Sequence, residues 1–155
     1  MRLRPYAPGD EVAMAALYQR SVRVLGPADY TPAQVEAWAV AGPTAARFAE
    51  RMADGRRAFM AEADGGTLVG FVDLEPDGHI DFLYAAPEAK GTGVADRLLD
   101  VVEVGAQADG IERLYSEASE AARRFFQRRG LDVLYRRDFE VGGVAIHNNA
   151  VEKRL

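Results

Sequence analysis

The pattern of apolar and polar positions changes period several times along the first third of the chain. Residues 2–6 alternate as in a short strand, and beyond Asp10 the apolar positions recur at helical spacing. The segment Thr31-Pro32-Ala33-Gln34 is a strong helix start, because the threonine can cap the helix, the proline fits its first turn and the glutamine can close a capping box. We expect this second helix to end near Gly42-Pro43 and a short third helix to cover residues 44–53.

The middle of the chain has the pattern of a sheet. Residues 57–63 and 67–74 are predicted as two strands joined by a hairpin turn, and residues 79–86 as a third consecutive strand. The rest of the chain alternates between the two kinds of element, with helices at 93–108 and 119–129 and strands at 112–118, 131–140 and 143–154.

This order of elements predicts a mixed α/β (α+β) fold, with a central sheet of about seven mostly antiparallel strands flanked by about four to five helices. The strands at 79–86 and 112–118 are separated by a helix, so we expect them to run parallel to each other. The length of 155 residues fits one domain, residues 1–155.

Composition and charge exclude several classes of function. The sequence has no cysteine and only two histidines, which excludes thiolate chemistry, disulfides and sulfur-ligated or multi-histidine metal sites. No apolar run approaches the ~18 residues that a membrane helix needs, and residues 1–20 lack the pattern of a signal peptide. The net charge of −5 has the wrong sign for a protein that binds a phosphate backbone. We therefore expect a cytoplasmic protein with no nucleic-acid or membrane partner.

The segment most informative about chemistry joins the strand at 79–86 to the helix at 93–108. Its loop reads Lys90-Gly91-Thr92-Gly93-Val94-Ala95. Glycines let backbone amides approach a ligand closely, and the free N–H groups at a helix start favour an anion. The loop lacks the Gly-Lys-Ser/Thr of a P-loop and the three-glycine spacing of the dinucleotide fingerprint. It therefore predicts a phosphate or pyrophosphate site of another kind.

Two segments resemble a known family. Lys90-x-x-Gly93-x-Ala95 is similar to the Arg/Gln-x-x-Gly-x-Gly/Ala signature of the GNAT superfamily of acyl-CoA-dependent N-acetyltransferases, and residues 122–131 resemble its Ala-x-x-Phe-Tyr-x-x-x-Gly-Phe segment. The order of elements is also that of the family, so the resemblance spans most of the chain. Tyr30-Thr31-Pro32, Ala37-Trp38-Ala39 and the ending Asn148-x-x-Val-Glu-Lys resemble the small bacterial YafP-like branch.

The resemblance implies a GNAT-type fold, acetyl-CoA as co-substrate and no metal. In such a fold a parallel pair of strands splays apart at the cofactor site, where the strand end holds the pantetheine arm and the glycine loop holds the pyrophosphate. Two phenylalanines of the later helix would wall the arm, although one of them can equally be a plain core residue. The implied cofactor-binding residues are Leu83, Tyr84, Ala85, Lys90, Gly91, Thr92, Gly93, Val94, Ala95, Ser119, Phe125 and Phe126.

The implied reaction needs a group that removes a proton from an amine before it attacks a thioester. Strand alternation places His79 and Asp81 on one face with Leu83. An imidazole of near-neutral pKa suits a base or water relay, and Asp81 could order that water or attract a cationic amine. Which of the two is the base stays open, and Glu117 on the neighbouring strand is the next candidate. Phe126 stands where the family often has a tyrosine acid, so the general acid is unassigned.

Tyr30, Trp38 and Asn148 are the candidates for the acceptor side, although Trp38 can equally anchor its helix and Asn148 can satisfy a strand edge. The leading function is transfer of an acetyl group from acetyl-CoA to a primary amine of a small molecule, by direct attack in a ternary complex. The alternatives are acetylation of a protein or peptide amine, or a non-catalytic acyl-CoA-binding regulatory module. A second copy of the chain is a candidate partner in a homodimer.

Overall fold

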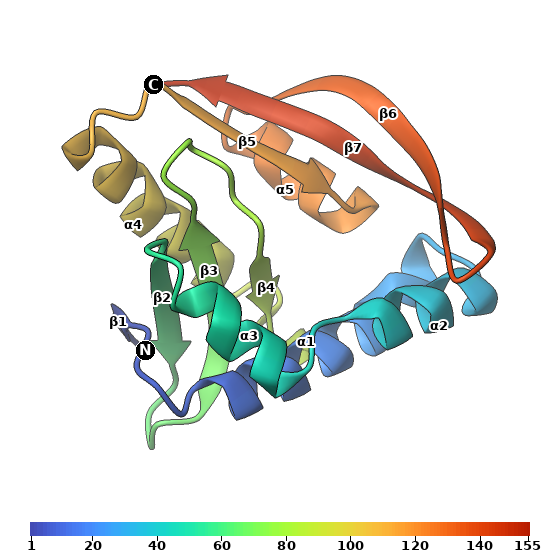
Figure 1. Cartoon of the computed structure of the whole chain (residues 1–155), viewed down its shortest axis with the longest axis horizontal. Helices are drawn as coiled ribbons and strands as arrows, with labels where there is room; N and C mark the ends of the chain where they lie inside the picture. Colours follow the sequence, from blue (N-terminus) through green and yellow to red (C-terminus); the bar gives the residue numbers. More distant parts are fainter.

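Five helices and seven strands make up the chain in the computed structural model, which describes residues 1–155 (Figure 1). The mixed α/β class and the mostly antiparallel strands expected from the pattern are confirmed. In chain order the elements are β1 (Arg2–Pro5), α1 (Glu11–Leu25), α2 (Pro32–Ala41), α3 (Ala45–Met52), β2 (Arg57–Glu62), β3 (Leu68–Leu74), β4 (Leu83–Ala85), α4 (Val94–Ala108), β5 (Arg113–Ala118), α5 (Glu120–Arg128), β6 (Asp132–Val141) and β7 (Val144–Arg154).

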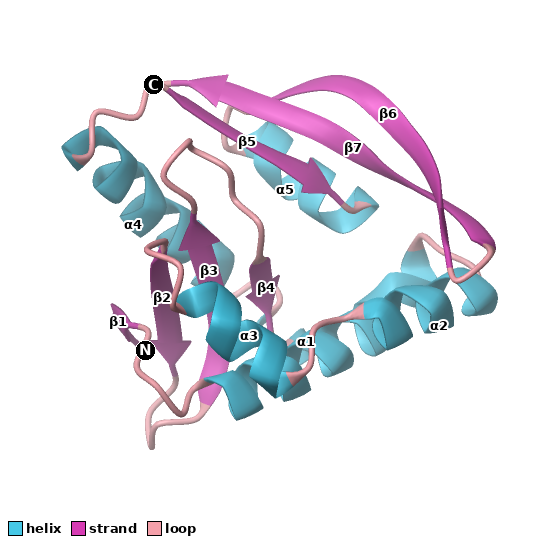
Figure 2. Cartoon of the chain, viewed as in Figure 1, coloured by secondary structure: helices cyan, strands magenta, loops and turns pink.

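The strands form two sheets rather than one. The first has the order β1-β2-β3-β4 and the second the order β5-β7-β6, and all neighbours within each sheet are antiparallel. Figure 2 shows α4 and α3 against the first sheet and α5 beneath the second, whose long β6–β7 hairpin reaches across to α2. None of the helices has the length and apolar character needed to cross a bilayer.

The main core lies between the first sheet and helices α1, α3 and α4. Phe48 of α3, Phe71 of β3 and Leu98 of α4 are completely buried there, and the rings of Phe48 and Phe71 meet edge to face with centroids 5.6 Å apart. Burial of each such side chain stabilises the fold by roughly 1.5–3 kcal/mol. A second, smaller cluster of Tyr30, Val35 and Ile146 attaches α2 to β7.

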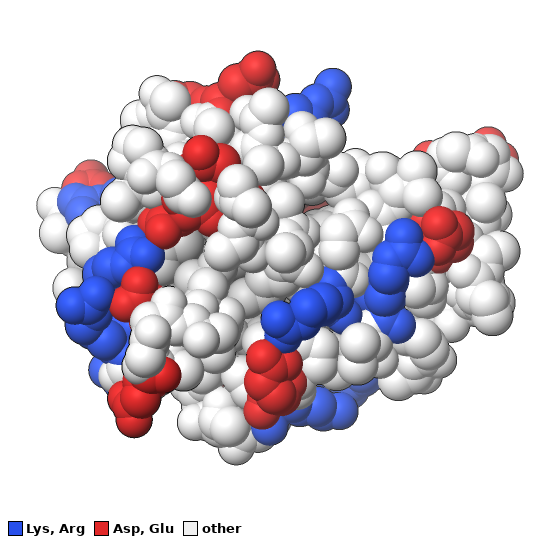
Figure 3. Space-filling model, turned by 90° about the horizontal axis from the view of Figure 1, so that it is seen from below, with Lys and Arg blue, Asp and Glu red and all other residues white.

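The surface carries both signs of charge. Figure 3 shows acidic and basic side chains close to one another on the underside of the chain, separated by wide uncharged areas. Ion pairs such as Arg20–Glu88, with 2.7 Å between nitrogen and oxygen, account for this mixture. No broad area of one sign covers the face seen in this view.

The two sheets meet at a single parallel bridge between His79 and Tyr115. The N–H of Ile80 donates to the carbonyl of Tyr115 at 2.9 Å, and the N–H of Tyr115 donates to the carbonyl of Gly78 at 3.1 Å. Gly78 has φ +97°, and a Cβ there would lie 1.9 Å from the carbonyl oxygen of Arg113. Only glycine therefore lets the two segments approach this closely.

The strand expected at 79–86 is shorter in the structure, and the expected parallel pair is reduced to this bridge. β4 begins only at Leu83, because before this residue the side chain of Asp73 replaces a backbone carbonyl as the hydrogen-bond acceptor. Its Oδ1 accepts the N–H groups of Asp81 and Phe82 at 3.0 and 2.8 Å. The chain bends at this point, and β4 and β5 diverge beyond it.

Replacement of Asp73 by alanine should strongly destabilise the fold. The Asp73 side chain is 1% exposed, and its Oδ2 accepts a hydrogen bond of 2.6 Å from Nη1 of Arg56, which is 5% exposed. Removal of one partner of a buried ion pair costs roughly 3–5 kcal/mol, because the other charge stays buried. Urea denaturation should show this loss for Asp73→Ala. Asp132→Ala, which removes an exposed carboxylate, should stay within about 0.5 kcal/mol of the wild type. Equal stabilities of the two variants would contradict the role given to Asp73.

Candidate active site

A groove of about 700 Å³ opens where β4 and β5 diverge. Its volume lies in the range of roughly 300–1,000 Å³ typical of small-molecule sites. Residues of β4, of the loop after it, of α1, of α2 and of α5 line its walls. The residues expected to bind the cofactor that lie in this groove are Leu83, Tyr84, Ala85, Lys90, Gly91, Thr92, Gly93, Val94, Ala95, Ser119 and Phe125.

The glycine loop presents backbone N–H groups to the groove. Gly91 and Gly93 have φ +78° and +85°, and Gly93 caps the N-terminus of α4. The N–H groups of Val94 and Ala95 lie in the first turn of α4, where no intrahelical acceptor exists. These groups and the helix dipole make the loop a favourable site for an anion.

The free edge of β4 faces the same groove. Hydrogen bonds from the N–H of Asp73 to the carbonyl of Phe82, and from the N–H of Ala86 to the carbonyl of Val69, direct Phe82 and Ala86 toward β3. Backbone groups alternate in direction along a strand, so those of Leu83 and Ala85 point into the gap between the sheets. An extended ligand can therefore hydrogen-bond to β4 there, in the place of a missing strand.

Helix α5 supplies one groove phenylalanine rather than two. Phe125 lines the groove, whereas Phe126 is 1% exposed and belongs to the main core. Consecutive helix residues point about 100° apart, so both could not face the same wall. Ser119 caps α5, and its Oγ accepts the N–H of Ala122 at 3.2 Å. The Ser119 hydroxyl proton stays free to donate.

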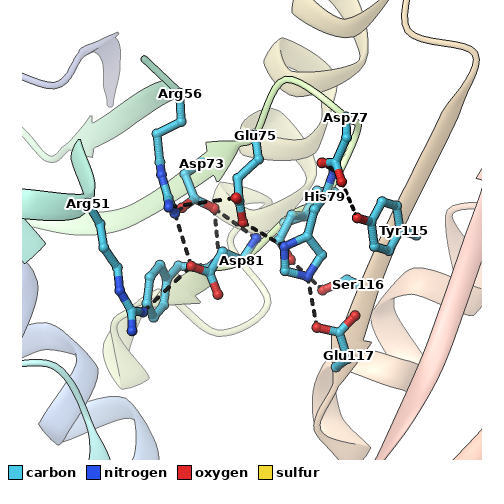
Figure 4. A network of polar contacts seen from close by, with 12 residues as sticks. Arg51, Arg56, Asp73, Glu75, Asp77, His79, Asp81, Tyr115, Ser116 and Glu117 are labelled. Atoms are coloured by element: carbon cyan, nitrogen blue, oxygen red, sulfur yellow. Dashed lines mark hydrogen bonds and ion pairs between the residues drawn. The ribbon is translucent and has the colours of Figure 1, made fainter. Parts of the chain in front are cut away.

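His79 is held between two carboxylates at the point where the sheets part (Figure 4). Its Nδ1 lies 2.7 Å from Oε1 of Glu75, and its Nε2 lies 2.8 Å from Oε1 of Glu117. Burial alone lowers the pKa of His79, but the hydrogen bonds to Glu117 and Glu75 outweigh it and raise the pKa to about 9. The imidazole is therefore protonated at neutral pH, contrary to the near-neutral pKa expected for a base.

Asp81 lies beside His79 but has different partners. Its Oδ2 accepts from Nη1 of Arg56 at 3.0 Å and lies 3.6 Å from Nη1 of Arg51 (Figure 4). The side chain keeps 27% exposure, whereas its neighbours Ile80 and Phe82 are buried. The expected alternation of faces therefore persists across the bend.

Glu117 completes the group of carboxylates at the opening of the gap. It is partly exposed, and the hydrogen bond from His79 lowers its pKa. The sequence pointed to Glu117 only as a reserve candidate, and nothing in it signalled the ion pairs of Arg51 and Arg56. Hydrophobic periodicity identifies elements, but it does not show which charged side chains from distant segments will meet.

One part of this network has the donor atoms for a metal. Ligand atoms of Glu75, His79 and Asp81 lie within 4.8 Å of one another. Guanidinium nitrogens of Arg56 lie 3.8 Å from a carboxylate oxygen of Glu75 and 3.0 Å from one of Asp81. The positive charge of Arg56 is therefore already paired with two of the three possible ligands and would repel a metal cation.

The three residues expected on the acceptor side lie in two places. Tyr30 and Trp38 line the groove together, with ring centroids 5.2 Å apart. The Tyr30 hydroxyl donates to the carbonyl of His147 and accepts the N–H of Glu120, both at 3.1 Å. Asn148 lies outside the groove on β7, 7% exposed, and its Oδ1 accepts from Nη1 of Arg137 at 3.0 Å.

Comparison with known proteins shows which family the chain belongs to. A family model described as an acetyltransferase (GNAT) domain matches residues 27–153. The chain belongs to the GNAT acetyltransferase family. It is therefore an acyltransferase, and the family resemblance carried by the loop Lys90–Ala95 is confirmed.

Individual relatives agree with the GNAT assignment. A crystal structure from Rhodopseudomonas palustris, described as a GCN5-related N-acetyltransferase (aminotransferase, class II), is 37% identical with a TM-score of 0.90 and covers 99% of this chain and 95% of its own. An uncharacterized N-acetyltransferase of Mycobacterium tuberculosis is 29% identical over 90% of this chain and 93% of its own length. YafP of Escherichia coli is 28% identical over 96% of this chain and 92% of its own, which confirms the likeness to that branch.

The GNAT fold also extends to more distant structures. The PaiA N-acetyltransferase of Thermoplasma acidophilum in complex with coenzyme A has a TM-score of 0.80 at 18% identity, and covers 99% of this chain and 98% of its own. At that identity the likeness shows the fold alone. The splayed pair of strands in this GNAT chain therefore belongs to an architecture shared well beyond its sequence relatives.

The stability of this GNAT chain should depend on pH through His79. The unfolded pKa of histidine is about 6.5, and the folded pKa is about 9. The stabilisation from protonated His79 is therefore fully present below about pH 6.5 and is lost as the pH rises toward 9. Urea denaturation should show a steeper fall in the wild type than in His79→Gln over this range. An NMR titration with His79 changing protonation near pH 6.5 would contradict the two-carboxylate arrangement.

Proposed function

We propose that the chain transfers the acetyl group of acetyl-CoA to a primary amine of a small molecule, by direct attack in a ternary complex. The observation that carries this proposal is that a groove suited to coenzyme A and a group of carboxylates lie at the same gap between β4 and β5. The glycine loop at the start of α4 and the free edge of β4 lie in the groove, and the carboxylates of Asp81 and Glu117 lie where the sheets part.

The groove residues fit coenzyme A in its chemistry. The N–H groups of Lys90 and Thr92 donate to the carbonyls of Pro87 and Ala89. The remaining amides between Gly91 and Ala95 would hold the pyrophosphate, with the Lys90 side chain adding an exposed positive charge. The outward backbone groups of Leu83 and Ala85 would bind the amides of the pantetheine arm, with Phe125 and Ser119 opposite. Two structures of the same fold, the PaiA N-acetyltransferase with coenzyme A and the Sinorhizobium meliloti phosphinothricin acetyltransferase with acetyl-CoA, support this assignment.

The charged residues at the gap would prepare the amine. Acetyl-CoA supplies the activated thioester, so this chain has to position the amine and accept its proton. The carboxylates of Asp81 and Glu117 can do both, directly or through a water molecule. His79 acts in this proposal as a cation that holds Glu117 ionised and in place, because an imidazole already protonated at neutral pH accepts no further proton.

Acetyl-CoA should stabilise the fold through the glycine loop. At one hundred times its Kd it should add about 2.7 kcal/mol to the free energy of unfolding. Gly93→Glu should abolish this gain by placing a carboxylate beside the pyrophosphate. Gly55→Glu is the matched control, since both glycines have positive φ and open space around an added Cβ.

Both glutamate variants should lose similar intrinsic stability, because both force a side chain into a left-handed backbone conformation. Thermal unfolding with and without acetyl-CoA separates this shared strain from the loss of binding. Full stabilisation of Gly93→Glu by acetyl-CoA would remove the loop from the binding site.

Removal of a carboxylate at the gap should slow catalysis without loss of acetyl-CoA binding. Asp81→Asn or Glu117→Gln should lower kcat by roughly 10²–10⁴ if the altered side chain accepts the proton. Asp54→Asn is the control, because Asp54 also pairs with Arg56 but lies in the turn between α3 and β2 rather than where the sheets part. The measurement is release of free thiol from acetyl-CoA with a panel of small amines and one peptide, which also tests the protein acceptor.

Wild-type rates in both Asp81→Asn and Glu117→Gln would show that no carboxylate at the gap accepts the proton. Tight acetyl-CoA binding with no turnover of any amine would contradict the proposed activity and favour a binding module.

A further inference from the structure

A second cavity lies on the face of the β5-β7-β6 sheet that carries Glu117. It has a volume of about 240 Å³ and is lined by residues of all three strands. In the strand register Glu117 of β5 and Tyr135 of β6 both lie opposite Ala150 of β7. Because the middle position of this row is an alanine, the larger side chains on either side leave a hollow above it.

Charged side chains of both signs line this hollow. On the β5 side Arg113 is paired with Glu152, and Glu117 is the carboxylate, with its Oε1 paired with His79. Arg137 lies on the β6 side, where Nη1 donates to Oδ1 of Asn148 at 3.0 Å and the guanidinium lies 5.6 Å from the centre of the Phe139 ring. A guanidinium has five N–H donors, and one of those of Arg137 is used by Asn148, so the others remain available to a ligand.

The β6 side also offers apolar surface. A bulge between Val133 and Tyr135 changes the register there, so the consecutive residues Leu134 and Tyr135 both line the hollow. Their side chains are 45% and 61% exposed. A ligand with an apolar part can therefore cover surface that is otherwise in contact with water.

The hollow and the groove are lined by neighbouring parts of the chain. Ser116 and Glu117 of β5 line the hollow, and Ser119, which follows β5 and caps α5, lines the groove. The Ser116 hydroxyl donates to the carbonyl of Ile80 at 2.7 Å, which holds β5 against the segment leading to β4. An amine bound at Glu117 is therefore two positions along the chain from the groove residue Ser119.

We infer that the acceptor is a small amino acid, a molecule that carries a carboxylate as well as the reacting amine, and that the hollow above Ala150 binds it. Glu117 receives the ammonium group, and Arg137 binds the carboxylate through a charge-assisted, two-pronged hydrogen bond. The apolar part lies against Leu134 and Tyr135. The volume is below the roughly 300–1,000 Å³ of drug-sized ligand sites, which suits a ligand of this size.

This inference rests on the proposed acetyl transfer and specifies its substrate. The bound ammonium gives one proton to Glu117 or to water, its nitrogen forms a bond to the acetyl carbon, and the bond from that carbon to the CoA sulfur breaks. The sulfur leaves as the thiolate, and the second proton that the nitrogen loses goes to this thiolate or to water. Arg137 takes no part in these changes. Its loss should therefore raise KM for an amino acid and leave kcat nearly unchanged.

The test uses pairs of acceptors that differ only by the carboxylate. L-Leucine with 3-methylbutylamine, L-phenylalanine with 2-phenylethylamine, and 4-aminobutyrate with propylamine are three such pairs. Wild-type kcat/KM should be at least roughly tenfold higher for the acid in one or more pairs, since a hydrogen bond between charged groups contributes about that much.

Arg137→Gln should remove this preference through KM, while its amide can still donate to Asn148. Arg136→Gln is the matched control, because Arg136 is exposed, points to the other face of β6 and pairs with Asp138. It should keep the preference in full, and a thermal melt of each variant checks that it is folded.

The outcomes separate this inference from the proposed function. Turnover with equal kcat/KM for both members of every pair, or equal effects of Arg137→Gln on both members, would overturn the amino-acid assignment and leave acetyl transfer standing. Turnover of no acceptor by a protein that acetyl-CoA still stabilises would overturn acetyl transfer and this inference with it.

Discussion

The divergence of β4 and β5 beyond one parallel bridge is the constraint on which the rest of this structure depends. The bridge at His79 and Tyr115 is close enough to need Gly78. Immediately after it, the Asp73 carboxylate takes the N–H groups of Asp81 and Phe82, and the chain turns away from β5. A regular parallel ladder between β4 and β5 would have paired the backbone groups at the edge of β4 and closed the groove. The buried side chain of Asp73 therefore helps to keep the site open.

The same carboxylate organises the charges at the gap. Arg56 is held by Asp73 and extends to Asp81, while His79 joins Glu75, which follows β3, to Glu117 of the second sheet. The carboxylates at this opening are therefore each paired with a cationic side chain. Burial of charge is costly unless it is paired, and this pairing lets anionic groups remain beside an apolar groove where an amine can approach them.

The two cavities differ in the ligand chemistry that they favour. The large groove presents N–H donors and apolar walls, which suits a long anionic ligand, and the hollow above Ala150 carries Glu117 on β5 and Arg137 on β6. β5 lines the hollow, and Ser119, directly after β5, lines the groove. In the proposed function, side chains of the second sheet would therefore bind the acceptor, while β4, the glycine loop and α5 would bind acetyl-CoA.

The sequence by itself determined the element types, the fold class and the position of the glycine loop, because helical spacing, capping residues and glycines at positive φ act over a few neighbouring residues. Only the tertiary structure decided that β4 would begin at Leu83, that Phe125 and not Phe126 would face the groove, and that His79 would be a cation. His79 and Glu117 lie 38 positions apart, and a pKa or a strand end set by such a partner has no local pattern. Long-range pairing of charged and polar side chains is decided by the packing of the two sheets, which no short window of sequence contains.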